Sequence, residues 1–314
     1  DGKHIAYTTG GQIWTMEEDG DDKTQVTKIS TGASGPVWSP DGKTLAFVSD
    51  VYPECTTEAC NKAEEDKAAG SKVTAKVTDR LLFKHWNEWR DRKRTHVFVI
   101  PRNGGVARDL TPGDFDSPPY GASTGVDYAF SPDSQEIAFL KNLDKIEAAS
   151  TNSDLFIMPL NGGTAKNITP TNKGYDASPV YTSDGKYILF RSQATATFES
   201  DRWRIMRYNR TTGETVELTR GFDDYADDVT LSADNKTVYF TSGQRGRTNL
   251  YSVPMEPDFR QRIATHVKRV PTDMSSFPSF NSVNLHRDGN TIVFASSSIG
   301  APPEVFSARL DRNE

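Results

Sequence analysis

The sequence is poor in cysteine, in histidine and in long apolar runs. It holds 2 cysteines and 5 histidines in 314 residues. The cysteines have no second pair and no histidine cluster beside them, which excludes a structural zinc site. No apolar run approaches the roughly 18 residues that a membrane-spanning helix needs, and the mean hydropathy is −0.63. The sequence therefore predicts no membrane span.

The charge balance excludes further classes. With 37 basic and 43 acidic residues the formal net charge is −6, which gives no general field to attract nucleic acid. The histidines lack the spacing of metal ligands, and no phosphate-binding glycine motif is present. We therefore expect no nucleic-acid partner, no metal and no cofactor. The histidines are His4, His85, His96, His266 and His286.

The two cysteines, Cys55 and Cys60, are separated by four residues. This spacing favours a short local disulfide, which would indicate an oxidising compartment. A reduced pair of loop thiols is the alternative.

An internal repeat organises the chain. An Asp-containing turn such as Ser39-Pro40-Asp41-Gly42-Lys43 recurs, and each time an apolar strand such as TLAFVS follows it. Proline presets the first turn dihedral, and glycine or asparagine accepts the positive φ of a tight hairpin. The aspartates of these turns, at steps of 40, 92, 51, 50 and 54 residues, are Asp1, Asp41, Asp133, Asp184, Asp234 and Asp288.

Two more strands follow most of these turns. The third reads HVFVI, DLFIMPL or WRIMRY, and a glycine-containing turn leads to a fourth that ends in DLT, NIT or ELT. Four short strands in a repeat of about 50 residues are typical of a β-propeller. We predict an all-β propeller of four-stranded blades over residues 1–314. Six repeats are visible, and seven blades are expected in the intact domain. The first repeat lacks an opening strand and the last a closing one, which leaves two alternatives open: a seventh blade before Asp1, or a blade completed by segments beyond both ends.

The 92-residue step predicts an insertion in the second blade, residues 51–94. Its first half, TTEACNKAEEDKAAG, suits a short exposed helix with Thr57 as N-cap and Gly70 as stop. Its second half, LLFKHWNEWRDRKRTHVFV, mixes aromatic and cationic groups, including Trp86 and Arg90. That mixture suits a binding surface or a domain contact. The alternative is an insertion that packs over a sheet edge.

Only two segments invite a chemical interpretation. Ser123 lies in a G-x-S-x-G match, but prolines precede it and a strand follows, so it lacks the strand-to-helix turn of a hydrolase nucleophile. The segment FESDRWR is more informative. Glu199 and Asp201 could hold an ammonium group beside the apolar walls of Phe198 or Trp203. In the alternative interpretation, Arg202 pairs with those two acids and leaves nothing for a ligand.

These segments together resemble the N-terminal propeller of the prolyl oligopeptidase family of serine peptidases, in its dipeptidyl-peptidase-five-like and acylaminoacyl-peptidase-like branch. The resemblance spans essentially the whole chain. Its most specific strings are LLFKHWNEWRDRKRTHVFV, SPDSQEIAFLKNLDKIEAASTNSDLFIMPLNGGTAKNIT and FESDRWRIMRYNRTTGE. The turns themselves are less specific, because TolB-like propellers share them.

The resemblance implies a C-terminal α/β-hydrolase domain after Glu314 that would carry a Ser-Asp-His triad. This chain alone is then expected to be inactive. Its implied role is to admit oligopeptide substrates by size and to bind their amino end, while the parent releases dipeptides. The implied location is periplasmic or secreted, and a homo-oligomer is left open.

Particular residues take roles under this resemblance. Glu199 is expected to bind the peptide amine, with Phe198 and Trp203 in support and Arg202 orienting the carboxylate. The stretch around Trp86 and Arg90 is expected to line the cavity rim or to contact the hydrolase domain.

Three alternatives stay open. The parent could be an acylaminoacyl peptidase, which accepts blocked amino ends. The chain could instead be a non-enzymatic, TolB-like periplasmic propeller that binds proteins. A propeller glycosidase or lyase would need paired catalytic carboxylates across the central axis.

Overall fold

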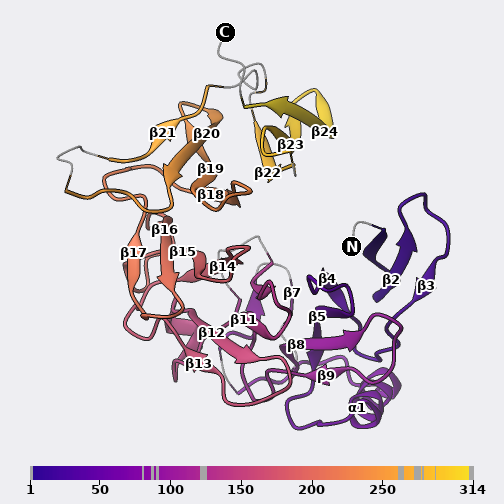
Figure 1. The fold of residues 1–314 in the computed structure, drawn as a ribbon. Helices are drawn as coiled ribbons and strands as arrows, with labels where there is room; N and C mark the ends of the chain where they lie inside the picture. The colour runs from indigo at the N-terminus through magenta and orange to yellow at the C-terminus, as the bar shows by residue number, and fades with distance from the viewer. Residues whose placement is uncertain are drawn as a thin grey trace. The chain divides into compact units, whose positions relative to one another are not determined.

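The computed structural model describes residues 3–79, 81–85, 88–89, 92–120, 126–260, 265–271, 277, 279–286 and 288–310 (Figure 1). Within them, the strands form six successive antiparallel sheets of three or four strands, which confirms the predicted all-β propeller of four-stranded blades. A two-stranded hairpin, one α-helix and one 3-10 turn complete the described part. No helix among these residues has the length and apolarity that crossing a bilayer requires.

The chain divides into two compact units, and the division falls inside the fourth blade. The first unit is residues 1–179 with 196–199, and the second is 180–195 with 200–314. Each unit is described by itself.

The first unit holds blades one to three and the insertion. The first blade is β1 (His4–Thr9), β2 (Gln12–Glu17) and β3 (Thr24–Gln25). The second is β4 (Ser34–Trp38), β5 (Thr44–Val51), β8 (Arg94–Pro101) and β9 (Arg108–Asp109). The third is β10 (Tyr128–Phe130), β11 (Glu136–Lys141), β12 (Asp154–Pro159) and β13 (Lys166–Asn167). The remaining elements are α1 (Glu58–Gly70), the hairpin β6 (Lys84–His85) and β7 (Glu88–Trp89), and η1 (Glu147–Ala149).

The fourth blade begins in the first unit, and the second unit holds the rest. The fourth blade is β14 (Asp176–Tyr181), β15 (Tyr187–Ser192), β16 (Arg204–Asn209) and β17 (Thr215–Glu217). The fifth is β18 (Asp227–Leu231), β19 (Thr237–Gln244), β20 (Arg247–Pro254) and β21 (Lys268–Arg269). The sixth is β22 (Phe280–Leu285), β23 (Thr291–Ser298) and β24 (Ala301–Arg309).

The repeated turn is held by its own side chains. Ser39 Oγ donates to Asp41 Oδ1 at 2.7 Å and accepts from the Thr44 N–H at 2.9 Å. Asp41 Oδ1 also accepts from the Lys43 N–H at 3.1 Å, and Gly42 takes a φ of 68°. The same bonds recur in the third, fourth and fifth blades, around Asp133, Asp184 and Asp234. Thr182 takes the place of the first serine in the fourth blade.

Each complete second strand buries a phenylalanine six residues after the turn aspartate. At this position the strand lies in the middle of a blade, so the ring packs against the neighbouring sheet and contributes to the core. Within its own blade, Phe47 also stacks on its cross-strand partner Phe98, at 5.6 Å between ring centroids. These rings, all 2% exposed or less, are Phe47, Phe139, Phe190, Phe240 and Phe294.

A buried threonine hydroxyl completes the ladder where the fourth strand ends. Thr169 Oγ1 accepts from the Leu155 N–H at 2.9 Å, while the preceding Ile168 N–H donates to the Leu155 carbonyl at 2.9 Å. The hydroxyl thus supplies the acceptor that a longer strand would have offered, and it satisfies the Leu155 N–H. The other three pairs, also 14 residues apart, are Thr27 with Ile13, Thr111 with Val97, and Thr219 with Ile205.

Candidate functional site

The connection between β15 and β16 carries the predicted amine-binding residues. Phe198 is 51% exposed, and the side chain of Glu199 is also exposed. Thr197, just before them, takes a φ of 63°, which is rare for a β-branched residue. Its N–H donates to Thr151 Oγ1 at 2.8 Å, in the connection between β11 and β12. That bond fixes the backbone of the loop that presents Phe198 and Glu199.

Arg202 and Trp203 lie in the second unit and take part in its packing. Arg202 donates to Glu217 Oε1 at 3.0 Å and to the Phe222 carbonyl at 2.5 Å. Trp203 is only 6% exposed, and the guanidinium of Arg191 lies 4.6 Å from the centre of its ring. The guanidinium of Arg202 thus contacts Glu217, a partner that neither interpretation of the sequence had proposed.

Asp201 serves the backbone of its own loop. Its carboxylate accepts from the N–H groups of Ala194, Thr195 and Arg202 at 2.7–2.8 Å. Desolvation alone would raise the pKa of Asp201, but these backbone hydrogen bonds outweigh it and lower the pKa. Asp201 is thus an ionised structural carboxylate.

The pairing of Glu217 with Arg202 was not predicted, although the repeat contains a signal for it. Glu217 lies two residues before Thr219, as Asp109 and Asn167 do before the threonines of their own fourth strands. In each blade this side chain meets one from the third strand: His96 Nδ1 lies 2.7 Å from Asp109, and Asn167 donates to Asp154 at 2.9 Å. The position is structural, and burial raises the pKa of Asp154.

The buried histidine of the second blade is not available as a general base. His96 is 1% exposed. Its Nδ1 contacts Asp109, and its Nε2 lies 2.9 Å from the Gly113 carbonyl, which can only accept a hydrogen bond. Both ring nitrogens are occupied, so His96 joins strand and loop. Ser123 lies outside the described residues.

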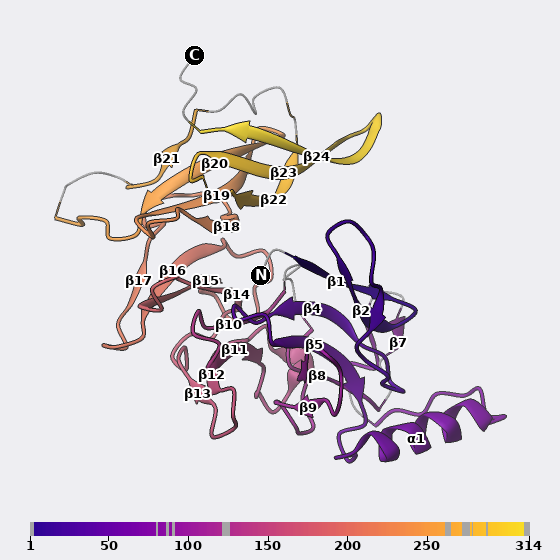
Figure 2. The same cartoon turned by 45° about the vertical axis from the view of Figure 1, so that its right-hand side comes forward.

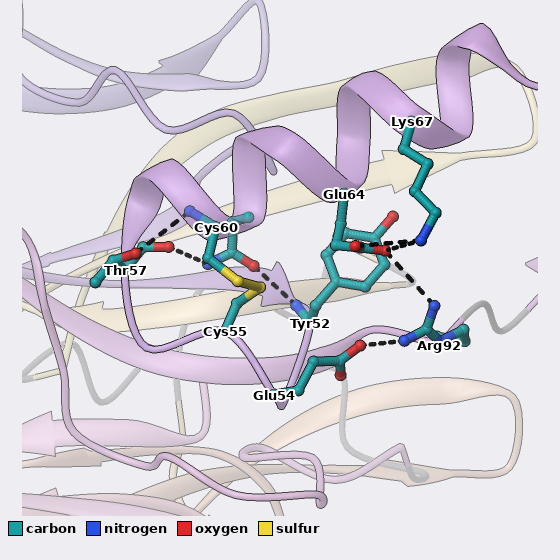
Figure 3. The surroundings of a disulfide bond; sticks show 9 residues. Tyr52, Glu54, Cys55, Thr57, Cys60, Glu64, Lys67 and Arg92 are labelled. Atoms are coloured by element: carbon teal, nitrogen blue, oxygen red, sulfur yellow. Dashed lines mark hydrogen bonds and ion pairs between the residues drawn. A yellow bond between two sulfur atoms is a disulfide. The ribbon is translucent and has the colours of Figure 1, made fainter.

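The insertion leaves β5 at Val51 and returns in β8 at Arg94, and these two residues are cross-strand partners. The helix α1 begins after its predicted N-cap, Thr57, whose Oγ1 accepts from the Cys60 N–H at 3.3 Å, and it ends at Gly70. Cys55 and Cys60 form a disulfide that fixes the first turn of α1 to the preceding loop (Figure 3). Figure 2 shows α1 lying clear of the blade sheets of its unit. Trp86 and Arg90, predicted to bind substrate or the hydrolase domain, lie outside the described residues.

A pocket of about 740 Å³ lies between α1, the segment that follows it and the start of β8. One wall is apolar and the other carries ion pairs. No group of three or more His, Cys, Asp or Glu side chains arranged to hold a metal occurs in the part of the chain that the structure describes.

Comparisons with known proteins agree with this architecture. No protein-family model matches the chain. Dipeptidyl-peptidase 5 of Porphyromonas endodontalis is 31% identical over 324 residues, covering 99% of this chain and 44% of that protein. The chain thus spans less than half the length of this curated relative.

Two solved structures share the fold. An acylaminoacyl peptidase in complex with Z-Gly-Gly-Phe-chloromethyl ketone superposes with a TM-score of 0.68 at 16% identity, covering 98% of this chain and 42% of that one. TolB from Acinetobacter baumannii superposes with a TM-score of 0.55 at 19% sequence identity, covering 99% of this chain and 64% of that one. Together with the sequence relationship to dipeptidyl-peptidase 5, this fold identifies the chain as a β-propeller of the prolyl oligopeptidase family.

Proposed function

We propose that this chain is the substrate-gating propeller of a serine exopeptidase that releases dipeptides from oligopeptides. The observation that carries the proposal is the match over 99% of the chain to a relative named dipeptidyl-peptidase 5. That relative is more than twice as long as the matched region, which supports a further, catalytic domain in the parent of this chain. A periplasmic or secreted location fits the disulfide between Cys55 and Cys60.

The chemistry of cleavage belongs to the proposed hydrolase domain. There a serine attacks the scissile carbonyl, a histidine transfers the proton, an aspartate orients that histidine, and backbone N–H groups stabilise the oxyanion. The propeller contributes by limiting access to short, unfolded peptides and by holding their amino end.

Glu199 is the proposed anchor for the peptide amine. Its carboxylate is exposed at a loop whose backbone is fixed through Thr197 and Thr151. A fixed carboxylate can hold an ammonium group by a charge-assisted hydrogen bond, and the exposed ring of Phe198 offers an apolar neighbour. Arg202, which contacts Glu217, and Trp203, which is buried in the second unit, take no part in the anchor in this proposal.

The test compares two variants of the full-length parent enzyme. We expect Glu199→Gln to lower kcat/KM about 10–100-fold on free-amine dipeptidyl chromogenic substrates, because the charged acceptor is lost. Glu214→Gln, at another exposed glutamate, is the matched control. If the Glu199→Gln enzyme keeps full activity on free-amine substrates, the anchor is wrong.

Two other functions remain as alternatives. An acylaminoacyl peptidase would cleave acetyl-aminoacyl substrates in the same assay and would not respond to Glu199→Gln. A TolB-like protein-binding propeller, favoured by the structural likeness to TolB, would have no hydrolase activity in the full-length protein.

A further inference from the structure

The pocket in the insertion has an apolar wall that faces solvent. It consists of large side chains from the segment after α1 and from the β6–β7 hairpin. Leaving so much apolar surface in water is unfavourable, and such patches commonly mark binding sites. The residues, with exposed fractions from 36% to 94%, are Val73, Val77, Leu81, Leu82, Phe83 and Trp89.

Two aromatic rings shape this wall. Phe83 and Trp89 lie 6.1 Å apart between ring centroids with a 31° tilt. The ammonium of Lys84 lies 5.6 Å from the centre of the Trp89 ring. A tilted aromatic pair of this kind offers flat apolar surface to an aliphatic or aromatic side chain.

The opposite wall is polar, but its charges are balanced within the wall. Glu64 pairs with Lys67 at 3.4 Å and with Arg92 at 3.6 Å, and Arg92 also pairs with Glu54 (Figure 3). Arg94 is similarly matched by Asp114 at 2.9 Å and by Asp116 at 3.8 Å. Because Glu64, Lys67, Arg92 and Arg94 are already engaged in ion pairs, this wall favours a neutral, apolar ligand over a charged one.

This polar wall is built in advance of any ligand. The disulfide and the Thr57 cap fix the start of α1, and Asn61 Oδ1 accepts from the Tyr52 N–H at 3.0 Å. Figure 3 shows Tyr52 between the helix and Arg92. A volume of about 740 Å³ lies in the usual range for ligand sites and is large enough for a few peptide residues.

The pocket also lies on the same unit as the proposed amine anchor. Glu147 lines the pocket, and Thr151, four residues later, holds the N–H of Thr197 beside Phe198. The connection between β11 and β12 therefore contributes both to the pocket and to the loop that carries Glu199.

We infer that this pocket binds apolar side chains of oligopeptides, and so gives the propeller a preference for peptides rich in leucine- or phenylalanine-like residues. The inference deepens and rests on the proposed peptide-binding function. In this inference the pocket selects among peptide side chains, whereas Glu199 binds the peptide amine.

The test measures binding of two blocked peptides to the 314-residue chain by calorimetry. We expect N-acetyl-Leu-Phe-Leu-amide to bind at least about tenfold more tightly than N-acetyl-Gly-Ser-Gly-amide, because it buries apolar surface against the wall. Val77→Asp should weaken binding of the apolar peptide at least about tenfold, since it places a charge on that wall. Val106→Asp is the matched control: Val77 is 94% exposed and Val106 is 91% exposed, and Val106 does not line this pocket.

A second variant guards against an indirect effect. Trp89→Ala removes the larger ring without adding charge and should also weaken the apolar peptide, while far-UV circular dichroism shows the blades unchanged. No binding, equal affinity for the two peptides, or equal affinity of Val77→Asp and Val106→Asp would each overturn the inference.

The blocked peptides carry no free amine, so this result is independent of the anchor. Tight binding of the apolar peptide, together with full activity of the Glu199→Gln enzyme, would support the pocket and refute the anchor. Equal affinity for the two blocked peptides, together with a large loss of activity in the Glu199→Gln enzyme, would support the anchor and refute the pocket.

Discussion

The turns between first and second strands differ sharply from the connections between second and third strands. The turns repeat one set of hydrogen bonds in blades two to five. The connections vary: residues 10–11, 245–246 and 299–300 are tight two-residue turns, whereas 52–93, 142–153 and 193–203 are long. Every candidate binding feature lies in the three long connections. The difference shows that one end of each strand pair maintains the fold while the other is free to acquire a function.

The first prediction concerns the hydrogen bonds that hold the strands of a blade together, and it has the largest expected effect. Thr169→Val removes the buried acceptor of the Leu155 N–H and should lower the free energy of unfolding by about 1–3 kcal/mol. Urea unfolding of the variant and the parent chain measures this loss of stability. Thr169→Ser keeps the hydroxyl and is the control. Equal stability of the valine and serine variants would show that the threonine bond does not support the blade.

The second prediction contrasts a turn with a connection. Gly42 takes a φ of 68° in the repeated turn, whereas Gly70 ends α1 and a Cβ there would meet nothing within 4 Å. We expect Gly42→Ala to cost about 1 kcal/mol of stability, because an L-residue is strained at that φ. Gly70→Ala should stay within about 0.5 kcal/mol of the parent chain in the same thermal or urea unfolding. If both variants lost the same stability, the comparison between turns and connections would fail.

The third prediction has the smallest expected effect and concerns pH. The hydroxyls of Ser39 and Thr182, followed by backbone N–H groups, lower the pKa of Asp41 and Asp184. An acid whose folded pKa is depressed contributes stability above its unfolded value, near 3.8, and that contribution is lost as the pH falls through the folded pKa. The Asp41→Asn, Asp184→Asn double variant should therefore lose stability at pH 6 and show a shallower decline between pH 5 and 2.

Asp228 gives a control of opposite sign. Burial, and to a lesser degree the charge of Asp227, raise the pKa of Asp228. Its contribution to stability therefore grows as the pH falls, and Asp228→Asn should make the acid decline steeper. Unfolding free energies of the three chains across the pH range measure both slopes. Parallel curves would contradict the hydrogen-bonding account of the turns.

The repeated turns and the strands beside them were predicted well, because the residues that determine them are close together in the sequence and recur in each blade. Aspartates, glycines and alternating apolar residues within six or seven positions determine each turn and strand, and the Thr57 cap needs only its own helix. The site was harder to predict because its contacts join residues that are distant in the sequence. Glu217 contacts the guanidinium of Arg202 over a separation of 15 residues, and Thr151 Oγ1 accepts from the Thr197 N–H over a separation of 46 residues. From the sequence, Trp203 was expected to contact a ligand, but in the structure it is buried and packs against Arg191.

The return of the insertion to its point of departure has a practical consequence. Because Val51 and Arg94 are paired across the ladder, the 52–93 segment spans no distance within the blade, and loop closure depends only weakly on length. This position is therefore suited to domain insertion. A foreign peptide or a reporter domain could replace residues 52–93 while both flanking strands keep their register.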